Sequence, residues 1–502
     1  MARATTGSLH LLSSPFPPPP HRSPPLLTAG VRLRRRRRAS SLVIAAMADA
    51  AAAPSPPSSS SAALPHSTLE TLGGGKDSIL PALKSLERPF KAFPVVGWSR
   101  HIETIFAAYF RSAPAVDFRY RRVCLRAPDD GAVAIDWAAG DDARLPADTP
   151  VLILMHGLSG GSGDSYVKHM FAEARRNGWR AVAYNGRGGG DSPVTTPQFY
   201  SASYTEDIRM VVKHVKTLYP SANVYAVGWS LGGNILVRYL GEESQNCPLS
   251  GAVSLCNPFN LVMADEDIRK GLNNIYDRAI ANSLSKIFQK NRLLFEGIGG
   301  EYNIDLADNG KTIRDYDEAI TRVTFGFKSV DEYYSKSCSS DSIKHVRIPL
   351  LCIQHKCFLK YGFNGRRDVK PMYSANKAYV WVDRKMEDLV GQINRLDSMA
   401  CSPPSSLPWK VFVNTQAFTR SIELPSMEYK FPTCTAENDP VAPSRAIPRE
   451  DIKANPSCLL IVTPNGGHLG WVAGDDAPFG APWTDRVAME FLNHVEKGRR
   501  EN

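Results

Sequence analysis

Short apolar runs alternate with amphipathic stretches from about residue 92 to residue 498, and this pattern predicts strands connected by helices. Strands that alternate with helices are typical of a mostly parallel sheet covered by helices on both faces. We therefore expect an α/β fold with eight strands. The predicted strands are residues 119–125, 132–137, 151–155, 180–184, 223–227, 251–255, 348–353 and 458–462, and the predicted helices are residues 166–177, 204–218, 231–240 and 483–495.

Residues 257–345 are rich in helical patterns and interrupt the alternation after the sixth strand. One interpretation is an ordinary surface elaboration, and the other is a helical cap over an active site. We favour the cap.

Residues 228–232 read Gly-Trp-Ser-Leu-Gly and lie between a predicted strand and a predicted helix. Glycines at these positions permit a sharp strand-to-helix turn that exposes the hydroxyl of Ser230, so the pattern predicts a nucleophile elbow. A serine hydroxyl is barely ionised at neutral pH and needs a base within hydrogen-bond reach. The sequence should therefore supply a histidine, an acid and donors for an oxyanion elsewhere.

Four motifs in order resemble the α/β-hydrolase superfamily. They are Phe-Pro-Val-Val-Gly-Trp at 93–98, His-Gly-Leu-Ser-Gly-Gly-Ser-Gly-Asp at 156–164, the elbow, and Gly-Gly-His-Leu-Gly-Trp at 466–471. The similar branch contains plant embryogenesis-associated hydrolases, YheT-like esterases and animal α/β-hydrolase-domain lipases. The resemblance implies an α/β-hydrolase fold and a carboxylesterase or acylglycerol lipase activity.

His468 is the predicted base, because it follows the apolar run 458–463 by five residues and glycines lie near it on both sides. His345 and His494 are interpreted as surface or packing histidines. The expected order of serine, acid and histidine makes Asp439 the predicted acid, in a loop (Ala-Glu-Asn-Asp-Pro-Val, 436–441) that resembles the family's acid loop. Asp265 and Asp267, after the sixth strand, are the alternative acids.

Two backbone N–H groups are predicted to hold the oxyanion. Leu231 directly follows the nucleophile, which is one usual position for such a donor. The family resemblance implies that Leu158, after the third strand, supplies the other. His156 is interpreted as a residue that shapes this loop.

Composition excludes several other classes of protein. The net charge is +10, but eight arginines in residues 1–46 and a basic segment at 355–435 leave about −3 for the rest, so no nucleic-acid partner is expected. Nine scattered cysteines predict neither a zinc site nor a disulfide framework. The glycine-rich stretches at 73–76 and 186–191 lack the context of a nucleotide site, so we expect no cofactor and no metal. No apolar run is long enough for a transmembrane segment, which leaves peripheral membrane contact and the oligomeric state open.

The first 46 residues are rich in Ser, Pro, Ala and Arg and contain no Asp or Glu. This composition resembles an organelle transit peptide and predicts import into the chloroplast. A mitochondrial or cytoplasmic location, or a nuclear signal in the arginine run, are the alternatives. Residues 47–91 are expected to be a linker and N-terminal extension.

Residues 355–435 depart from the family pattern, because they separate the seventh strand from Asp439. Joining residue 354 to residue 436 would restore a strand that runs into its acid loop. Two interpretations remain: translated intronic sequence in a faulty gene model, or a poorly ordered elaboration.

The combined motifs predict a serine hydrolase that cleaves carboxylic esters, with short to medium acyl chains or acylglycerol-type lipids as substrates. The alternative hypothesis is a hydrolase-like binding or scaffold protein in which residues 355–435 displace the acid. Peptidase activity is a third hypothesis.

Overall fold

The computed structural model of the 502-residue protein describes residues 69–355 and 439–501, except 95, 98 and 115–117. The predicted transit peptide, the linker up to residue 68 and residues 356–435 of the atypical segment lie outside the described residues.

A single mixed sheet of nine strands forms the centre of the described chain, in the order β1-β9-β8-β7-β6-β4-β5-β3-β2. The six strands β4 to β9 run parallel, while β1, β2 and β3 pair antiparallel at the two sides. The strands are β1 (Glu70–Leu72), β2 (Tyr120–Arg126), β3 (Ala132–Ala138), β4 (Val151–Met155), β5 (Arg180–Asn185), β6 (Val224–Trp229), β7 (Gly251–Leu255), β8 (Leu350–His355) and β9 (Cys458–Thr463).

All eight predicted strands are present, and β1 is an additional one. Its three residues pair with β9 at the sheet edge, and a run that short carries no detectable alternation. The strand β8 starts two residues later than predicted, after Pro349, which has no N–H to contribute to the sheet. It also ends later, at His355, the residue at which the atypical segment was expected to begin.

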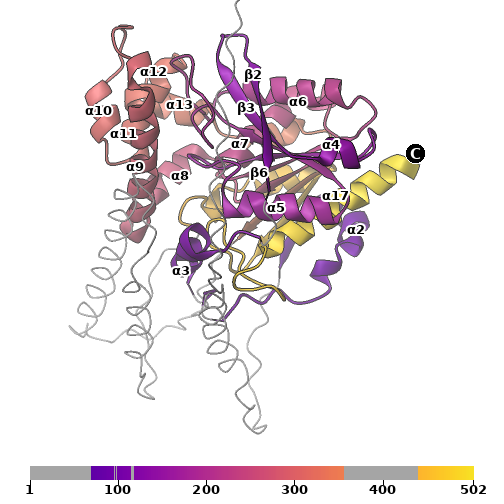
Figure 1. Ribbon diagram of the computed structural model, residues 1–502. Helices are drawn as coiled ribbons and strands as arrows, with labels where there is room; N and C mark the ends of the chain where they lie inside the picture. The colour runs from indigo at the N-terminus through magenta and orange to yellow at the C-terminus, as the bar shows by residue number, and fades with distance from the viewer. Residues whose placement is uncertain (1–68, 95, 98, 115–117, 356–438, 502) are drawn as a thin grey trace, which may run out of the picture. The chain divides into compact units, whose positions relative to one another are not determined.

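Helices cover both faces of the sheet (Figure 1). The helices α5 and α17 pack on one face, and α6 and α7 pack on the other. No helix in the described part of the chain is long and apolar enough to cross a membrane. The helices outside the segment between β7 and β8 are α2 (Lys76–Ile79), α3 (Arg100–Ile105), α4 (Asp141–Arg144), α5 (Ser165–Arg176), α6 (Glu206–Leu218), α7 (Leu231–Glu243), α16 (Arg449–Ala454) and α17 (Trp483–Glu501).

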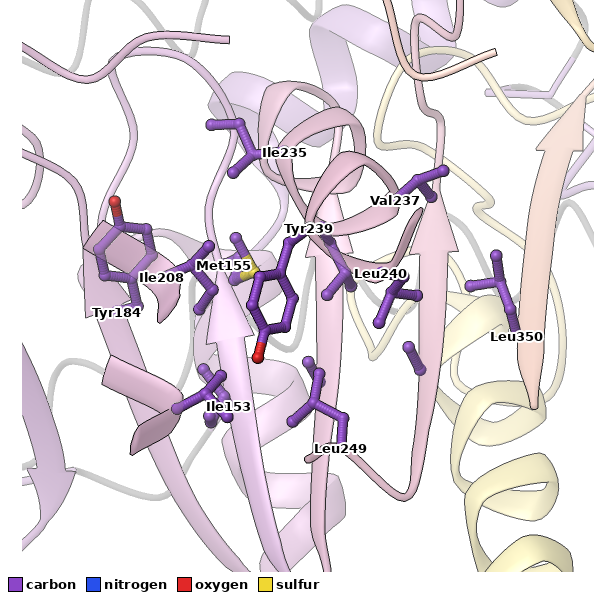
Figure 2. Close-up of a cluster of buried hydrophobic side chains, with 14 of the residues drawn as sticks. Ile153, Met155, Tyr184, Ile208, Ile235, Val237, Tyr239, Leu240, Leu249 and Leu350 are labelled. Carbon is purple, nitrogen blue, oxygen red and sulfur yellow. The ribbon is translucent and has the colours of Figure 1, made fainter. Parts of the chain in front are cut away.

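Alternation along the central strands builds the two halves of the core. Ile153 and Met155 of β4 lie on the side of α7, in one apolar cluster with Ile235 and Tyr239 (Figure 2). Leu152 and Leu154 of the same strand belong instead to the apolar cluster on the side of α5 and α17. Each such buried apolar side chain contributes about 1.5–3 kcal/mol to folding, so β4 is firmly held beside β6, the strand that leads into the elbow.

The segment between β7 and β8 forms a helical layer with its own apolar cluster. Phe288 and Phe295 pack there with Phe199 of the main body, so the layer is anchored to the sheet domain. Figure 1 shows most of these helices gathered on one side of the sheet. They are α8 (Leu261–Ile268), α9 (Asn274–Asn291), α10 (Ile304–Asn309), α11 (Ile313–Tyr316), α12 (Arg322–Thr324) and α13 (Val330–Lys336).

Candidate active site

Ser230 occupies a sharp turn between β6 and α7. Its φ of 51° and ψ of −120° are strained for a residue with a side chain. The turn needs glycine on both sides: a Cβ on Gly228 would lie 2.5 Å from the carbonyl oxygen of Gly232, and a Cβ on Gly232 would lie 2.3 Å from that of Met155. The sequence therefore folds here as a nucleophile elbow does.

Ser230, His468 and Asp439 form a continuous chain of hydrogen bonds. The Nε2 atom of His468 lies 2.9 Å from Oγ of Ser230, and its Nδ1 atom lies 3.0 and 3.1 Å from the two carboxylate oxygens of Asp439. A carboxylate only accepts, so Nδ1 carries the proton and Nε2 is left to accept from the serine hydroxyl. This arrangement can remove a proton from Ser230 when the hydroxyl attacks an electrophile.

The electrostatic environment keeps Asp439 ionised. Burial alone raises the pKa of this carboxyl group, but the neighbouring His468 and His355, together with hydrogen bonds, lower the pKa to about 2. Two of those bonds come from the backbone N–H groups of Val441 and Ala442, at 2.8 and 2.9 Å. Asp439 can therefore stabilise a positive imidazole at neutral pH.

The loop after β4 passes directly beside Ser230. A Cβ on Gly157 would lie 3.3 Å from the Cβ of Ser230, and both Leu158 and Leu231 line the same cavity as the serine. Leu231 is the first residue of α7, where backbone N–H groups have no partner within the helix. His156 shapes this loop, because its Nδ1–H donates to the carbonyl of Gly157 at 2.6 Å and its Nε2 accepts from a backbone N–H at 2.9 Å.

A cavity of about 120 Å³ extends from Ser230 beneath the helices between β7 and β8. Its walls are mainly apolar, with Asp265 and Asp317 as the acidic members. Burial raises the pKa of Asp317 to about 7, although the hydroxyl of Tyr334 donates to it at 2.8 Å. The apolar wall consists largely of Leu158, Phe199, Leu231, Leu261, Ala264, Ile268, Ile280, Leu284, Ile287, Ile313 and Val441.

Comparison with known proteins agrees with this geometry. The family model of the alpha/beta hydrolase fold matches residues 150–340. Embryogenesis-associated protein EMB8 of Picea glauca is 49% identical over 440 residues, which cover 86% of this chain and 78% of that protein. The chain belongs to the α/β-hydrolase superfamily. The family resemblance and the fold expected from the sequence are thereby confirmed.

Other relatives of this α/β-hydrolase carry names of lipid or ester hydrolases. Phospholipase ABHD3 of Homo sapiens is 27% identical over 406 residues, which cover 80% of this chain and 78% of that protein. Monoacylglycerol lipase of Saccharomyces cerevisiae is 27% identical over 299 residues, which cover 50% of this chain and 66% of that protein. The relatives thus support ester hydrolysis as the general type of reaction.

Residues near α3 hold the histidine loop of the hydrolase, and the sequence did not reveal them. The hydroxyl of Thr104 accepts from the backbone N–H of His468 at 2.7 Å. Arg111 donates to the carbonyl of Leu469 at 2.9 Å, and Glu103 accepts from another backbone N–H of the loop at 2.8 Å. The nearest sequence signal was the 93–98 motif just before them, which indicates no role for the residues that follow it.

The alternative acids and histidines lie elsewhere. Asp265 is paired with Arg269 and Arg314, and Asp267 is paired with Lys270 and Arg445, so neither serves His468. His345 is exposed in a 3₁₀ turn, and His494 is half-buried in α17. The choice of Asp439 over the alternatives agrees with its position. Asp439 contacts His468 directly, which speaks against the hypothesis of a displaced acid.

Proposed function

We propose that the protein is a serine hydrolase that cleaves carboxylic esters through an acyl-enzyme. The observation that carries this proposal is the hydrogen-bonded chain of Ser230, His468 and Asp439 at the mouth of a mainly apolar cavity. Serine, base and acid in this geometry support nucleophilic attack on an acyl carbon.

In the proposed reaction, Oγ of Ser230 attacks the ester carbonyl while Nε2 of His468 takes the hydroxyl proton. His468 then gives that proton to the leaving alcohol, and Asp439 stabilises the positive imidazole between the two transfers. A water molecule, activated by the same histidine, releases the acid in the second half. The backbone N–H groups of Leu158 and Leu231 hold the oxyanion, and one such donor typically contributes about 10²- to 10³-fold to turnover.

The substrate proposed is an ester with a short to medium acyl chain or an acylglycerol-type lipid. The apolar wall favours a hydrocarbon chain over a charged acid, because burial of apolar surface stabilises the complex by about 25 cal/mol per Å². Two relatives are named phospholipase and monoacylglycerol lipase, which supports a lipid ester for this chain as well. Carboxylesterase and acylglycerol lipase are both compatible with this substrate class.

A fluorophosphonate probe and a series of p-nitrophenyl esters test the proposal. We expect the probe to label Ser230 and the esters to be hydrolysed, with both activities lost in Ser230→Ala. A matched control is Ser283→Ala on α9, whose hydroxyl donates to the carbonyl of Ala279 at 3.1 Å within its own helix. Folded wild-type protein that neither reacts with the probe nor hydrolyses any ester would refute the enzyme and favour the scaffold hypothesis. Faster hydrolysis of an amide than of the matching ester would favour a peptidase.

A further inference from the structure

His355 is a second buried histidine beside the acid of the proposed catalytic site. It is the last residue of β8 and lies opposite Thr463 of β9. The ring stands edge-on to Trp471, with ring centres 6.0 Å apart and planes at 89°. Within the described residues neither ring nitrogen has a hydrogen-bond partner, although the side chain is only 1% exposed. Buried polar groups without partners are rare, so this ring calls for an explanation.

The carboxylate of Asp439 is unevenly supplied with donors. Its Oδ1 atom accepts from His468 and from the backbone N–H groups of Val441 and Ala442. Its Oδ2 atom, among the bonds of the described chain, accepts only from His468, at 3.1 Å. The Nδ1 atom of His355 faces this oxygen at 3.6 Å. Within the described residues, an unpaired ring nitrogen of His355 therefore faces the carboxylate oxygen that has fewer donors.

The charge state of His355 suits a hydrogen bond better than an ion pair. Burial lowers the pKa of His355 to about 4, while Asp439 raises it and His468 and Arg100 lower it further. The ring is therefore neutral at neutral pH and has one N–H. Because a carboxylate only accepts, contact with Asp439 places that proton on Nδ1.

We propose that His355 is a positioning residue, whose Nδ1–H holds Oδ2 of Asp439 and so keeps the carboxylate aligned with His468; this inference rests on the proposed function. The 3.6 Å separation is longer than a hydrogen bond, and an approach of less than about 1 Å would close it. Catalytic hydrogen bonds are often long before substrate binds and tighten during the reaction. The contact would therefore act when positive charge develops on His468.

Two substitutions separate this role from simple packing. His355→Leu fills the space without a donor, whereas the amide nitrogen of His355→Asn can occupy the place of Nδ1. We expect the leucine variant to lose about tenfold in kcat with KM changed less than about twofold, and the asparagine variant to stay within about threefold of the wild type. A carboxylate with one donor fewer also holds a positive imidazole more strongly. The acidic limb of the pH–kcat profile should therefore move to higher pH in the leucine variant alone.

Equal kinetics and equal pH profiles for the two variants would overturn the proposal, as would a change confined to KM. If the leucine variant fails to fold, His355→Gln replaces it, because the longer side chain takes its amide away from the Nδ1 position. Equal activity of the asparagine and glutamine variants would then overturn the proposed role of His355.

A measurement without turnover keeps this inference separate from the proposed function. In Ser230→Ala protein, the hydrogen-bonded Nδ1–H proton of His468 can be followed by NMR. We expect its resonance to shift in the added His355→Leu change and to remain near its original position with His355→Asn. An inactive wild type would refute the esterase, whereas an unshifted resonance in both double variants would refute the role of His355.

Discussion

Gly232→Ala should disable the proposed site by moving two parts of it apart. The added Cβ would lie 2.3 Å from the carbonyl oxygen of Met155 and 2.5 Å from that of His156. Ordinary contacts of this kind need about 3.5 Å, so α7 and the loop after β4 must separate by about 1 Å. That loop carries Leu158, and a 1 Å error in such a site can cost about 10²-fold in rate. The overpacking should lower the free energy of unfolding by about 1–3 kcal/mol.

Hydrolysis of a p-nitrophenyl ester, with kcat and KM measured separately, and thermal unfolding test this prediction. Gly498→Ala is the matched control, because Gly498 is also in a helix but a Cβ there has no atom within 4 Å. Alanine in place of glycine should stabilise that helix by up to about 1 kcal/mol and leave turnover unchanged. Suppose instead that Gly232→Ala kept kcat/KM within about threefold and had the melting temperature of the wild type. That result would refute the reasoning that close packing of Gly232 against the loop after β4 maintains the geometry of the site.

Three further substitutions test the acid, the histidine loop and the cavity. Asp439→Asn should lower kcat by about 10⁴-fold without loss of folding, and a loss below about tenfold in the ester assay would argue against its role. Thr104→Val should leave the buried N–H of His468 without its acceptor, at a cost of about 1–3 kcal/mol, and lower kcat far more than it raises KM; equal kcat would contradict the clamp. Asp317 keeps its proton in the folded state up to about pH 7, whereas in the unfolded chain it ionises near pH 4, so wild-type stability should fall across this window. Denaturant unfolding at several pH values should show a flatter profile for Asp317→Asn, with a gain on the order of a few kcal/mol above pH 7, and parallel profiles would contradict the raised pKa.

Local sequence patterns were sufficient for most of the fold and for the central site residues. The alternation of apolar strands and amphipathic helices predicts eight strands because all of these strands except β2 bury both faces. The elbow can be recognised from the sequence because its turn requires glycine at residues 228 and 232, and both lie within a five-residue motif around Ser230. The order of serine, acid and histidine then narrows the partners to Asp439 and His468.

The missed features depend on contacts between distant segments. Thr104 and His468 are 364 positions apart, and the bond between them involves a backbone N–H that any residue type could supply. Neither the hydrophobic periodicity of the chain nor the spacing of its motifs indicates such a pair. The sequence places His355 in the atypical segment, because joining residue 354 to residue 436 restores the family's acid loop. In the structure His355 is instead the last residue of β8, in register with Thr463 of β9.

The clamp between the region of α3 and the histidine loop has a consequence for the order in which the molecule matures. Ser230 is made near the middle of the chain, but His468, its proposed base, follows β9 and is held by a side chain synthesised 364 residues earlier. A nascent or prematurely terminated chain that stops before β9 would carry the elbow without His468. Under the proposed function, such a chain would be inactive, and activity would appear only after β9 has joined the sheet and His468 has bound Thr104.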